Sequence, residues 1–187
     1  MGDGSIYWYR QAMRAIEISE QFDRFTELGL VLENGHSHRI TMLDEVGGQV
    51  PTTREALIAE LTSRPDVSFQ LWFPGTSIGP YTRFRRLSES TTAQTYGLDG
   101  LTEEERLQIR ATVWDAFGRN LAASEALVVD IFNRTEELVD WDAAAMRREI
   151  PTVARPDLVA MRLRSPTRGR SGSSLDEFQL ASYRAPD

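Results

Sequence analysis

The sequence contains no lysine and no cysteine, so all 21 cationic side chains are arginines. A chain of this length would ordinarily carry roughly a dozen lysines. These absences exclude a Schiff-base lysine, a phosphate-loop lysine, a thiolate nucleophile and a zinc site built on sulfur. A GC-rich bacterial genome is the simplest source of the pattern, because arginine codons are GC-rich. A selected escape from lysine modification is the alternative.

Long apolar runs are also missing: none approaches the length of a membrane span, and the residues after Met1 lack a signal-peptide pattern. The net charge of -7 argues against a general nucleic-acid binder, which needs a basic surface. Apolar residues make up 41% of the 187 residues, which is enough for the core of one domain. We therefore expect a cytoplasmic protein that needs no cofactor and no membrane.

Charge divides the chain into two parts. Residues 1–150 carry 15 arginines and 24 acidic residues, a net charge of -9. Residues 151–187 carry 6 arginines and 4 acidic residues, a net charge of +2, and are rich in proline, serine and glycine. This composition predicts an acidic domain over 1–150 and an extension over 151–187. The apolar residues of the extension could dock as a final strand; they are Leu175, Phe178, Leu180 and Tyr183.

The first half of the chain carries signals for a helix and a hairpin. Helical spacing of apolar residues predicts a helix over about residues 8–22. Apolar alternation over 28–32, followed by Asn34-Gly35 and a second run over 36–43, predicts a hairpin. Asn-Gly is expected in such a turn because both positions take a positive φ. Gly47-Gly48 then ends the second strand.

Two capping boxes mark later helices. Thr52 with Glu55 opens a helix that ends before Pro65, and Thr102 with Glu105 opens the longest helix. Strands are expected at 67–73, 81–87, 91–96 and 126–132, the last in the middle of the sheet, and a final helix begins at Asp142. Successive strands favour an α+β fold with a mainly antiparallel sheet of about five to seven strands. We expect three to four helices, packed mostly on one face.

The strongest binding signal is spread over three predicted strands. Alternation places Tyr81, Arg83 and Arg85 on one face of their strand. If the strands are neighbours with coinciding faces, one surface displays aromatic and arginine side chains of the kinds enriched at binding hot spots. Arginines there would also suit an anionic ligand. If a helix covers the surface, the aromatics belong to the core. The predicted set is Trp72, Tyr81, Arg83, Arg85 and Tyr96.

The two histidines, His36 and His38, are the side chains suited to proton transfer near neutral pH. Because they are two residues apart on a predicted strand, they share a face. They could hold one metal ion if Glu33 or Asp44 completed the ligand set. The simpler interpretation is two exposed histidines after a turn, with no metal.

Asp130 interrupts an apolar strand, and a carboxylate there must be paired or lie at the strand end. It could bind an arginine. It could instead join an acidic cluster that binds a divalent cation; the other members would be Glu136, Glu137, Asp140 and Asp142.

Two functions remain open. The first is a non-enzymatic binding module that recognises a protein partner, or an anionic small molecule, through the aromatic and arginine face. In size and charge alone the chain is similar to small acidic immunity proteins that neutralise a basic toxin. The second is a small enzyme or ligand-binding protein whose His36 or His38 works with Asp130 or Glu45, while an arginine holds an anionic substrate. The sequence favours binding over catalysis.

Overall fold

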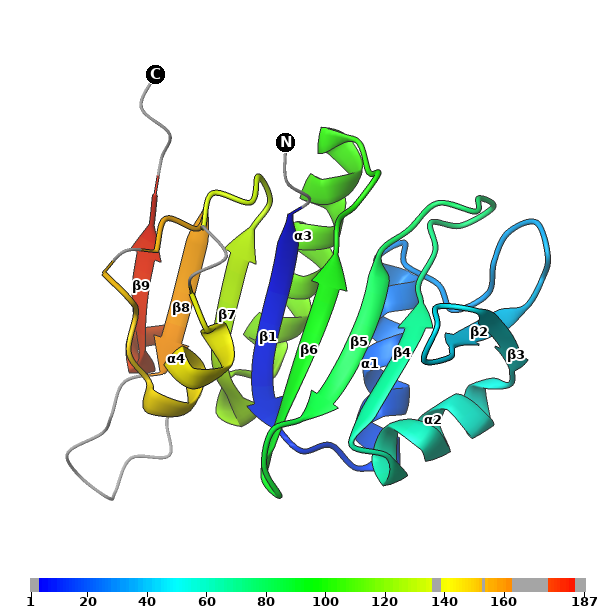
Figure 1. Ribbon diagram of the computed structural model, residues 1–187, viewed down its shortest axis with the longest axis horizontal. Coiled ribbons are helices and arrows are strands. Elements are labelled where there is room, and N and C mark those ends of the chain that lie inside the picture. The colour runs from blue at the N-terminus through cyan, green and yellow to red at the C-terminus, as the bar shows by residue number, and fades with distance from the viewer. Residues whose placement is uncertain (1–3, 136–138, 153, 163–174, 184–187) are drawn as a thin grey trace.

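The computed structural model describes residues 4–135, 139–152, 154–162 and 175–183. The strands are β1 (Ser5–Gln11), β2 (Ile40–Leu43), β3 (Gln49–Thr52), β4 (Asp66–Gln70), β5 (Tyr81–Arg86), β6 (Thr91–Gly97), β7 (Ser124–Asp130), β8 (Leu158–Arg162) and β9 (Phe178–Ser182). They form one sheet in the order β3-β2-β4-β5-β6-β1-β7-β8-β9, with every neighbouring pair antiparallel (Figure 1). The helices are α1 (Ala15–Glu27), α2 (Arg54–Ser63), α3 (Glu103–Arg119) and α4 (Trp141–Arg147), with 3₁₀ turns at Leu121–Ala123 and Leu175–Glu177.

The main core lies between the sheet and the two long helices, α1 and α3, which stand behind the sheet in Figure 1. We call this side of the sheet the helical face. Aromatic rings meet edge to face across it: Trp8 and Phe117 have ring centroids 6.4 Å apart, and Phe22 and Phe69 are 5.7 Å apart. Such pairs add to the stabilisation from apolar burial. α2 packs against α1 and β4.

The opposite side of the sheet, which we call the outer face, is covered over only part of its width. α4 places Trp141, Ala144 and Ala145 in a second apolar cluster with Tyr9 and Val128. That cluster covers the region around β1, β7 and β8, while no described helix lies over β4 and β5 on this side (Figure 1). Among the described elements, the outer face over β4 and β5 is therefore uncovered, and this region is where a site can form.

The first element is a strand, and the helix predicted over residues 8–22 is wrong. β1 lies between β6 and β7, so Trp8 is buried on the helical face and Tyr9 on the outer face. A strand buried on both faces loses the polar and apolar alternation that marks a strand in sequence. The helix begins only at Ala15, where Glu17 accepts the N–H of Arg14 at 2.7 Å.

The tight turn predicted at Asn34-Gly35 is also wrong. The Asn34 Oδ1 accepts the backbone N–H groups of His36 and Ser37, each at 2.9 Å, which shapes a wider loop. Asparagine can turn the chain with its side chain as well as with a positive φ, and here the side chain decides. No strand forms over 28–32, although Val31 makes a single bridge to Trp72.

The hairpin in this region joins β2 to β3 through residues 44–48, the stretch that was predicted to end a strand. The Asp44 carboxylate accepts the N–H groups of Val46 at 3.0 Å and Gly48 at 2.6 Å. Gly47 has φ of 82°, a conformation that glycine adopts without steric cost. The paired glycines therefore form a turn within the hairpin.

Helix starts were predicted with mixed success. The capping box of Thr102 and Glu105 is confirmed, with the Glu105 side chain accepting the Thr102 N–H at 2.7 Å. α2 is capped one residue later than predicted, by Thr53, and α4 two residues earlier, by Asp140. Neighbouring threonines and aspartates offer equivalent caps, so sequence fixes these starts only within a turn.

The α+β class and the antiparallel sheet are confirmed, but the sheet is larger than the five to seven strands expected. The difference comes from β1, β3 and the pair β8–β9, which extends the sheet beyond β7. β7 lies inside the sheet, as its apolar sequence predicted. In the described part of the chain, no helix has the length and apolar character required to cross a membrane.

Candidate functional site

Three of the five predicted binding residues form a row on the outer face of β5. Arg85 lies opposite Ala93, which lies opposite Tyr9 on β1, so the odd-numbered residues of β5 share the face of Tyr9. Tyr81 and Arg83 therefore face outward as well. Tyr81 is 40% exposed, which leaves much of its ring accessible.

The other two predicted residues lie elsewhere. Tyr96 is paired with Thr82, so it points to the helical face, where it is fully buried and donates its hydroxyl to Gln94 at 2.7 Å. Trp72 follows the end of β4 and is buried in the single bridge to Val31. The predicted set of five thus reduces to the row of Tyr81, Arg83 and Arg85, which we call the β5 row.

Each member of the β5 row is held by a neighbour. The Tyr81 hydroxyl lies 2.6 Å from the Ser68 hydroxyl on β4. Arg83 makes two parallel hydrogen bonds to the Asp66 carboxylate, the Nε to Oδ1 contact being 2.8 Å. These bonds are the main reason why the pKa of Asp66 lies below its ordinary value.

The third member, Arg85, links the row to α4. Its guanidinium lies 2.7 Å from the carboxylate of Asp142, and the same carboxylate accepts the Tyr9 hydroxyl at 3.0 Å. Burial is the largest cause that raises the pKa of Tyr9 above its ordinary value, and the charge of Asp142 adds to it. Asp142 therefore fixes both the position of α4 on the sheet and the end of the β5 row.

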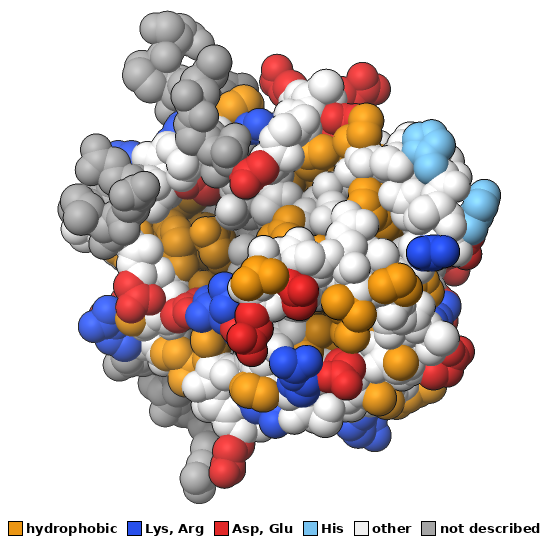
Figure 2. Space-filling view, turned by 45° about the vertical axis from the view of Figure 1, so that its right-hand side comes forward, with side chains coloured by type: hydrophobic (Ala, Val, Ile, Leu, Met, Phe, Trp, Pro, Cys, Tyr) orange, Lys and Arg blue, Asp and Glu red, His pale blue; other side chains and the backbone are white. Residues whose placement is uncertain are grey.

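A groove of about 760 Å³ lies beside the row. One wall is the turn between β2 and β3, whose Val46 side chain is 91% exposed, and the other wall includes Arg64 and Ser68. Tyr81 and Arg83 line it as well. The groove exists because β2 stays paired with β4 only as far as Leu43. Figure 2 shows arginines and acidic residues next to one another among apolar side chains on this side of the molecule.

The charges that line the groove do not cancel. Asp66 neutralises Arg83, and Arg64 lies 3.4 Å from Glu60. Asp44 accepts backbone N–H groups of its own turn, and among the described residues neither Asp44 nor Glu45 pairs with a cation. The charge left without a partner in the groove is therefore negative.

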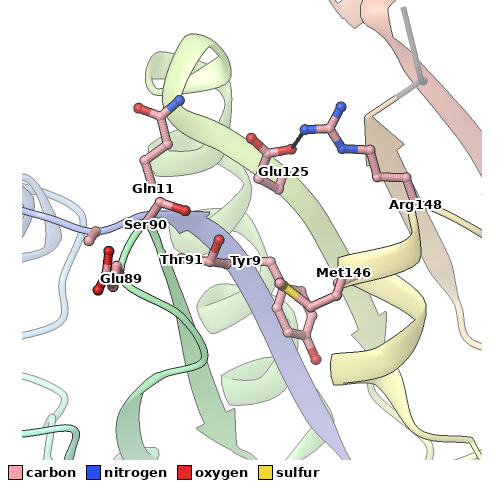
Figure 3. Close-up of a pocket in the computed structure, with 10 residues that line it drawn as sticks. Tyr9, Gln11, Glu89, Ser90, Thr91, Glu125, Met146 and Arg148 are labelled. Atoms are coloured by element: carbon pink, nitrogen blue, oxygen red, sulfur yellow. Dashed lines mark hydrogen bonds and ion pairs between the residues drawn. The ribbon is translucent and has the colours of Figure 1, made fainter.

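A second hollow of about 420 Å³ lies between α4 and the ends of β1 and β7 (Figure 3). Glu125 and Arg148 form an ion pair of 2.8 Å on one side, and Glu89 and Ser90 lie on the other. This hollow was not predicted from the sequence, because its lining comes from four separate segments with no shared motif.

The histidines do not join a catalytic group. The His36 Nδ1 lies 2.6 Å from the Ser77 hydroxyl, and the His38 Nδ1 lies 3.1 Å from the Glu33 carboxylate. Both imidazoles are exposed and line neither the groove nor the second hollow. They lie at one margin of the molecule in Figure 2. Across the residues with described positions, no three His, Cys, Asp or Glu side chains gather closely enough to hold a metal ion.

Asp130 is buried at the end of β7 and binds its own chain. Its carboxylate accepts the backbone N–H groups of Arg134 at 2.7 Å and Thr135 at 2.9 Å. Backbone donors thus stabilise the charge, and neither the arginine pairing nor the acidic cluster is needed. Glu136 and Glu137, which were predicted for that cluster, lie outside the described residues.

Arg10 is a buried cation that was not predicted from the sequence. Arg10 is 3% exposed and donates to the amide oxygens of Gln21 at 2.9 Å and Asn120 at 3.4 Å, with its guanidinium 4.8 Å from the Trp8 ring. Burial lowers the pKa of this guanidinium below its ordinary value. Asn120 is the C-cap of α3, where a positive charge is favourable. Arg10 therefore joins β1 to both long helices.

Comparisons with known proteins add no assignment. No protein-family model, no curated protein and no solved structure matches the chain.

Proposed function

We propose that the protein is a non-enzymatic binding module that recognises a basic protein partner through the β5 row and the adjoining groove. The observation that supports the proposal is the region of the outer face over β4 and β5 that no described helix covers. There Tyr81, Arg83 and Arg85 project from one strand, each held by a hydrogen bond or ion pair from a neighbouring element.

Fixed side chains of these types favour binding. Tyrosine and arginine dominate the residues that carry binding energy at protein interfaces. A side chain already held in place loses little conformational entropy when a partner arrives, so more of the contact energy appears as affinity. Ser68, Asp66 and Asp142 supply this support before any partner binds.

The charges favour a protein partner with basic side chains over an anionic small molecule. Arg83 and Arg85 already have carboxylate partners, so an anion would have to displace Asp66 or Asp142. Asp44 and Glu45 leave negative charge in the groove, and the whole chain carries a net charge of -7. A basic partner would be drawn toward such a surface and oriented on it.

The shape of the groove agrees with a macromolecular partner. Small-molecule sites are mostly apolar cavities that enclose their ligand, whereas charged and polar side chains make up more than half of the residues that line this groove. The alternative enzyme pairs a histidine with Asp130 or Glu45, whereas in the described part of the chain His36 contacts Ser77 and His38 contacts Glu33. A segment of a protein surface fits the groove better than a small molecule does.

Quantitative capture tests the proposal. The immobilised chain is exposed to extract from the organism that makes it, beside Tyr81→Ala and the control Leu107→Ala, which removes a 44% exposed side chain on α3. We expect the wild type and Leu107→Ala to retain a stoichiometric basic protein that Tyr81→Ala loses. Equal retention by all three chains, or retention of no stoichiometric protein by any of them, would refute the proposal.

A further inference from the structure

The sheet has two edges in the described part of the chain, and they differ in chemistry. At one edge β3 has four residues and contains Pro51, which has no N–H to offer to another strand. Short strands and prolines are the usual protection of a sheet edge against pairing with a further strand. The edge at β3 is therefore closed to a partner.

The edge at β9 lacks such protection. β9 has five residues, Phe178 to Ser182, with neither a proline nor a charged side chain. Among the described strands it pairs with β8 alone. In the described part of the chain no strand lies on its other side, and an uncharged edge of this kind attracts a further strand.

An apolar side chain marks the same edge. Phe178 is buried against Phe117 of α3, with ring centroids 5.3 Å apart, and anchors β9 to the main core. Leu180 lies two residues on, opposite the core residue Ala160, so it shares the helical face but is 52% exposed. The apolar core thus extends to Phe178 at the edge strand, and the next side chain on that face, Leu180, is exposed.

We infer that β9 pairs antiparallel with β9 of a second copy, about a twofold axis near Leu180. Such an axis sets Leu180 against its counterpart, covers both leucines and joins the two sheets into one. Twofold dimers are the commonest protein assemblies, and their contacts are formed by one self-complementary surface.

A second copy suits this edge better than an unrelated strand. Because β9 is uncharged, self-pairing sets no like charges against each other. Glu177, which directly precedes β9, is bound by Arg162 of the same chain at 2.6 Å. The groove lies beside β4, and five strands separate β4 from β9 in the sheet, so dimerisation leaves the proposed binding site free.

Molar mass in solution tests the inference. Light scattering over about two decades of concentration should show a wild-type chain that doubles its mass as concentration rises. Leu180→Arg should stay at the mass of one chain, whereas Leu107→Arg, the same change at a 44% exposed position on α3, should still double. A wild type that keeps the mass of one chain throughout, or a dimer that persists in Leu180→Arg, overturns the inference.

Amide hydrogen exchange of the wild type supplies a test that needs no variant. Amides of residues 178–182 should exchange more slowly at high concentration, because the free edge becomes hydrogen-bonded, while those of β3 should not change. If the mass doubles but exchange in β9 is independent of concentration, the copies meet elsewhere and the inference is wrong.

Discussion

Arg83 and Asp66 form a diagonal cross-strand pair: Arg83 lies opposite Ser68 in the register of β5 and β4, yet its guanidinium reaches two residues along to Asp66. The two parallel hydrogen bonds hold the guanidinium in a fixed position relative to the Asp66 carboxylate. This pair neutralises the centre of the β5 row, so the surface offers a fixed arginine without a free positive charge.

Asp66→Asn should lower the free energy of unfolding at neutral pH by about 0.5–1 kcal/mol, because both side chains are more than a third exposed and water screens the pair. The pKa of Asp66 is lowered in the folded protein. Its stabilisation is therefore present above the unfolded pKa of about 3.9 and is lost as pH falls through the folded value. Urea unfolding of both chains should converge in acid; an unchanged gap would contradict this account.

Tyr81→Ala should weaken binding of the captured partner by about 2 kcal/mol, about thirtyfold in Kd, since an exposed and fixed tyrosine is a typical hot spot. Its effect on unfolding should be about 1 kcal/mol, because the change removes the hydrogen bond to Ser68 and part of a side chain packed on the sheet. Calorimetric titration measures the first quantity and urea unfolding the second. Loss of binding together with a large loss of stability would mean that Tyr81 acts through the fold.

Glu45→Arg should slow association with a basic partner by about threefold to tenfold and weaken the dependence of the rate on salt, because charges at the rim of an interface act mainly on association. Glu89→Arg is the matched control: it makes the same change of charge in an exposed turn that lines the other hollow. Stopped-flow kinetics measures both. Equal slowing by the two variants would show a general effect of net charge and would argue against the groove.

Tyr9 and Tyr96 should resist ionisation until the protein unfolds in alkali. Burial raises the pKa of both above the unfolded value of about 10. The neutral forms therefore stabilise the fold fully below about pH 10, and this stability is lost as pH rises further. Tyrosinate absorbance should show two of the five tyrosines appearing together with loss of the fold, and one fewer in Tyr9→Phe. Ionisation of all five before unfolding would contradict the prediction.

Arg10→Ala should destabilise the protein by about 2–4 kcal/mol, because it removes a buried side chain, takes one of two donors from the Gln21 amide oxygen and removes the guanidinium donor of the Asn120 oxygen. Arg10→Met should cost less, since methionine preserves packing against Trp8. Urea unfolding compares the two. Equal losses would show that the hydrogen bonds, and not the packing, carry the contribution of Arg10.

Local signals predicted the elements that depend on local chemistry. The capping box at Thr102 and the apolar run of β7 need no distant partner to form, and both are confirmed. β1 was missed because its burial on two faces is a property of the assembled sheet, which appears in sequence only as a continuous aromatic and apolar run. The hairpin was predicted at the wrong turn, because Asn34 and Gly47 are both typical turn residues. Only the pairing of β2 with β3 in the folded sheet selects the turn at Gly47.

Only the part of the candidate site that depends on local sequence could be predicted. The parity of Tyr81, Arg83 and Arg85 follows from one strand and required no other information. The buried position of Tyr96 could not be predicted, because it depends on the register between β5 and β6. That register pairs Tyr96 with Thr82 on the helical face. The groove depends on where β2 parts from β4, and Asp142 reaches the row only through α4. None of these relationships is encoded by nearby residues.

The contact at the β5 row can be measured directly in cells. A photoreactive phenylalanine derivative is placed at position 81, and in a parallel chain at the control position 107, in the organism that makes the protein. The account predicts one dominant covalent adduct with a basic protein from position 81, lost when Glu45 is replaced by Arg, and no such adduct from position 107. The same adducts from both positions, or none from position 81, would contradict it.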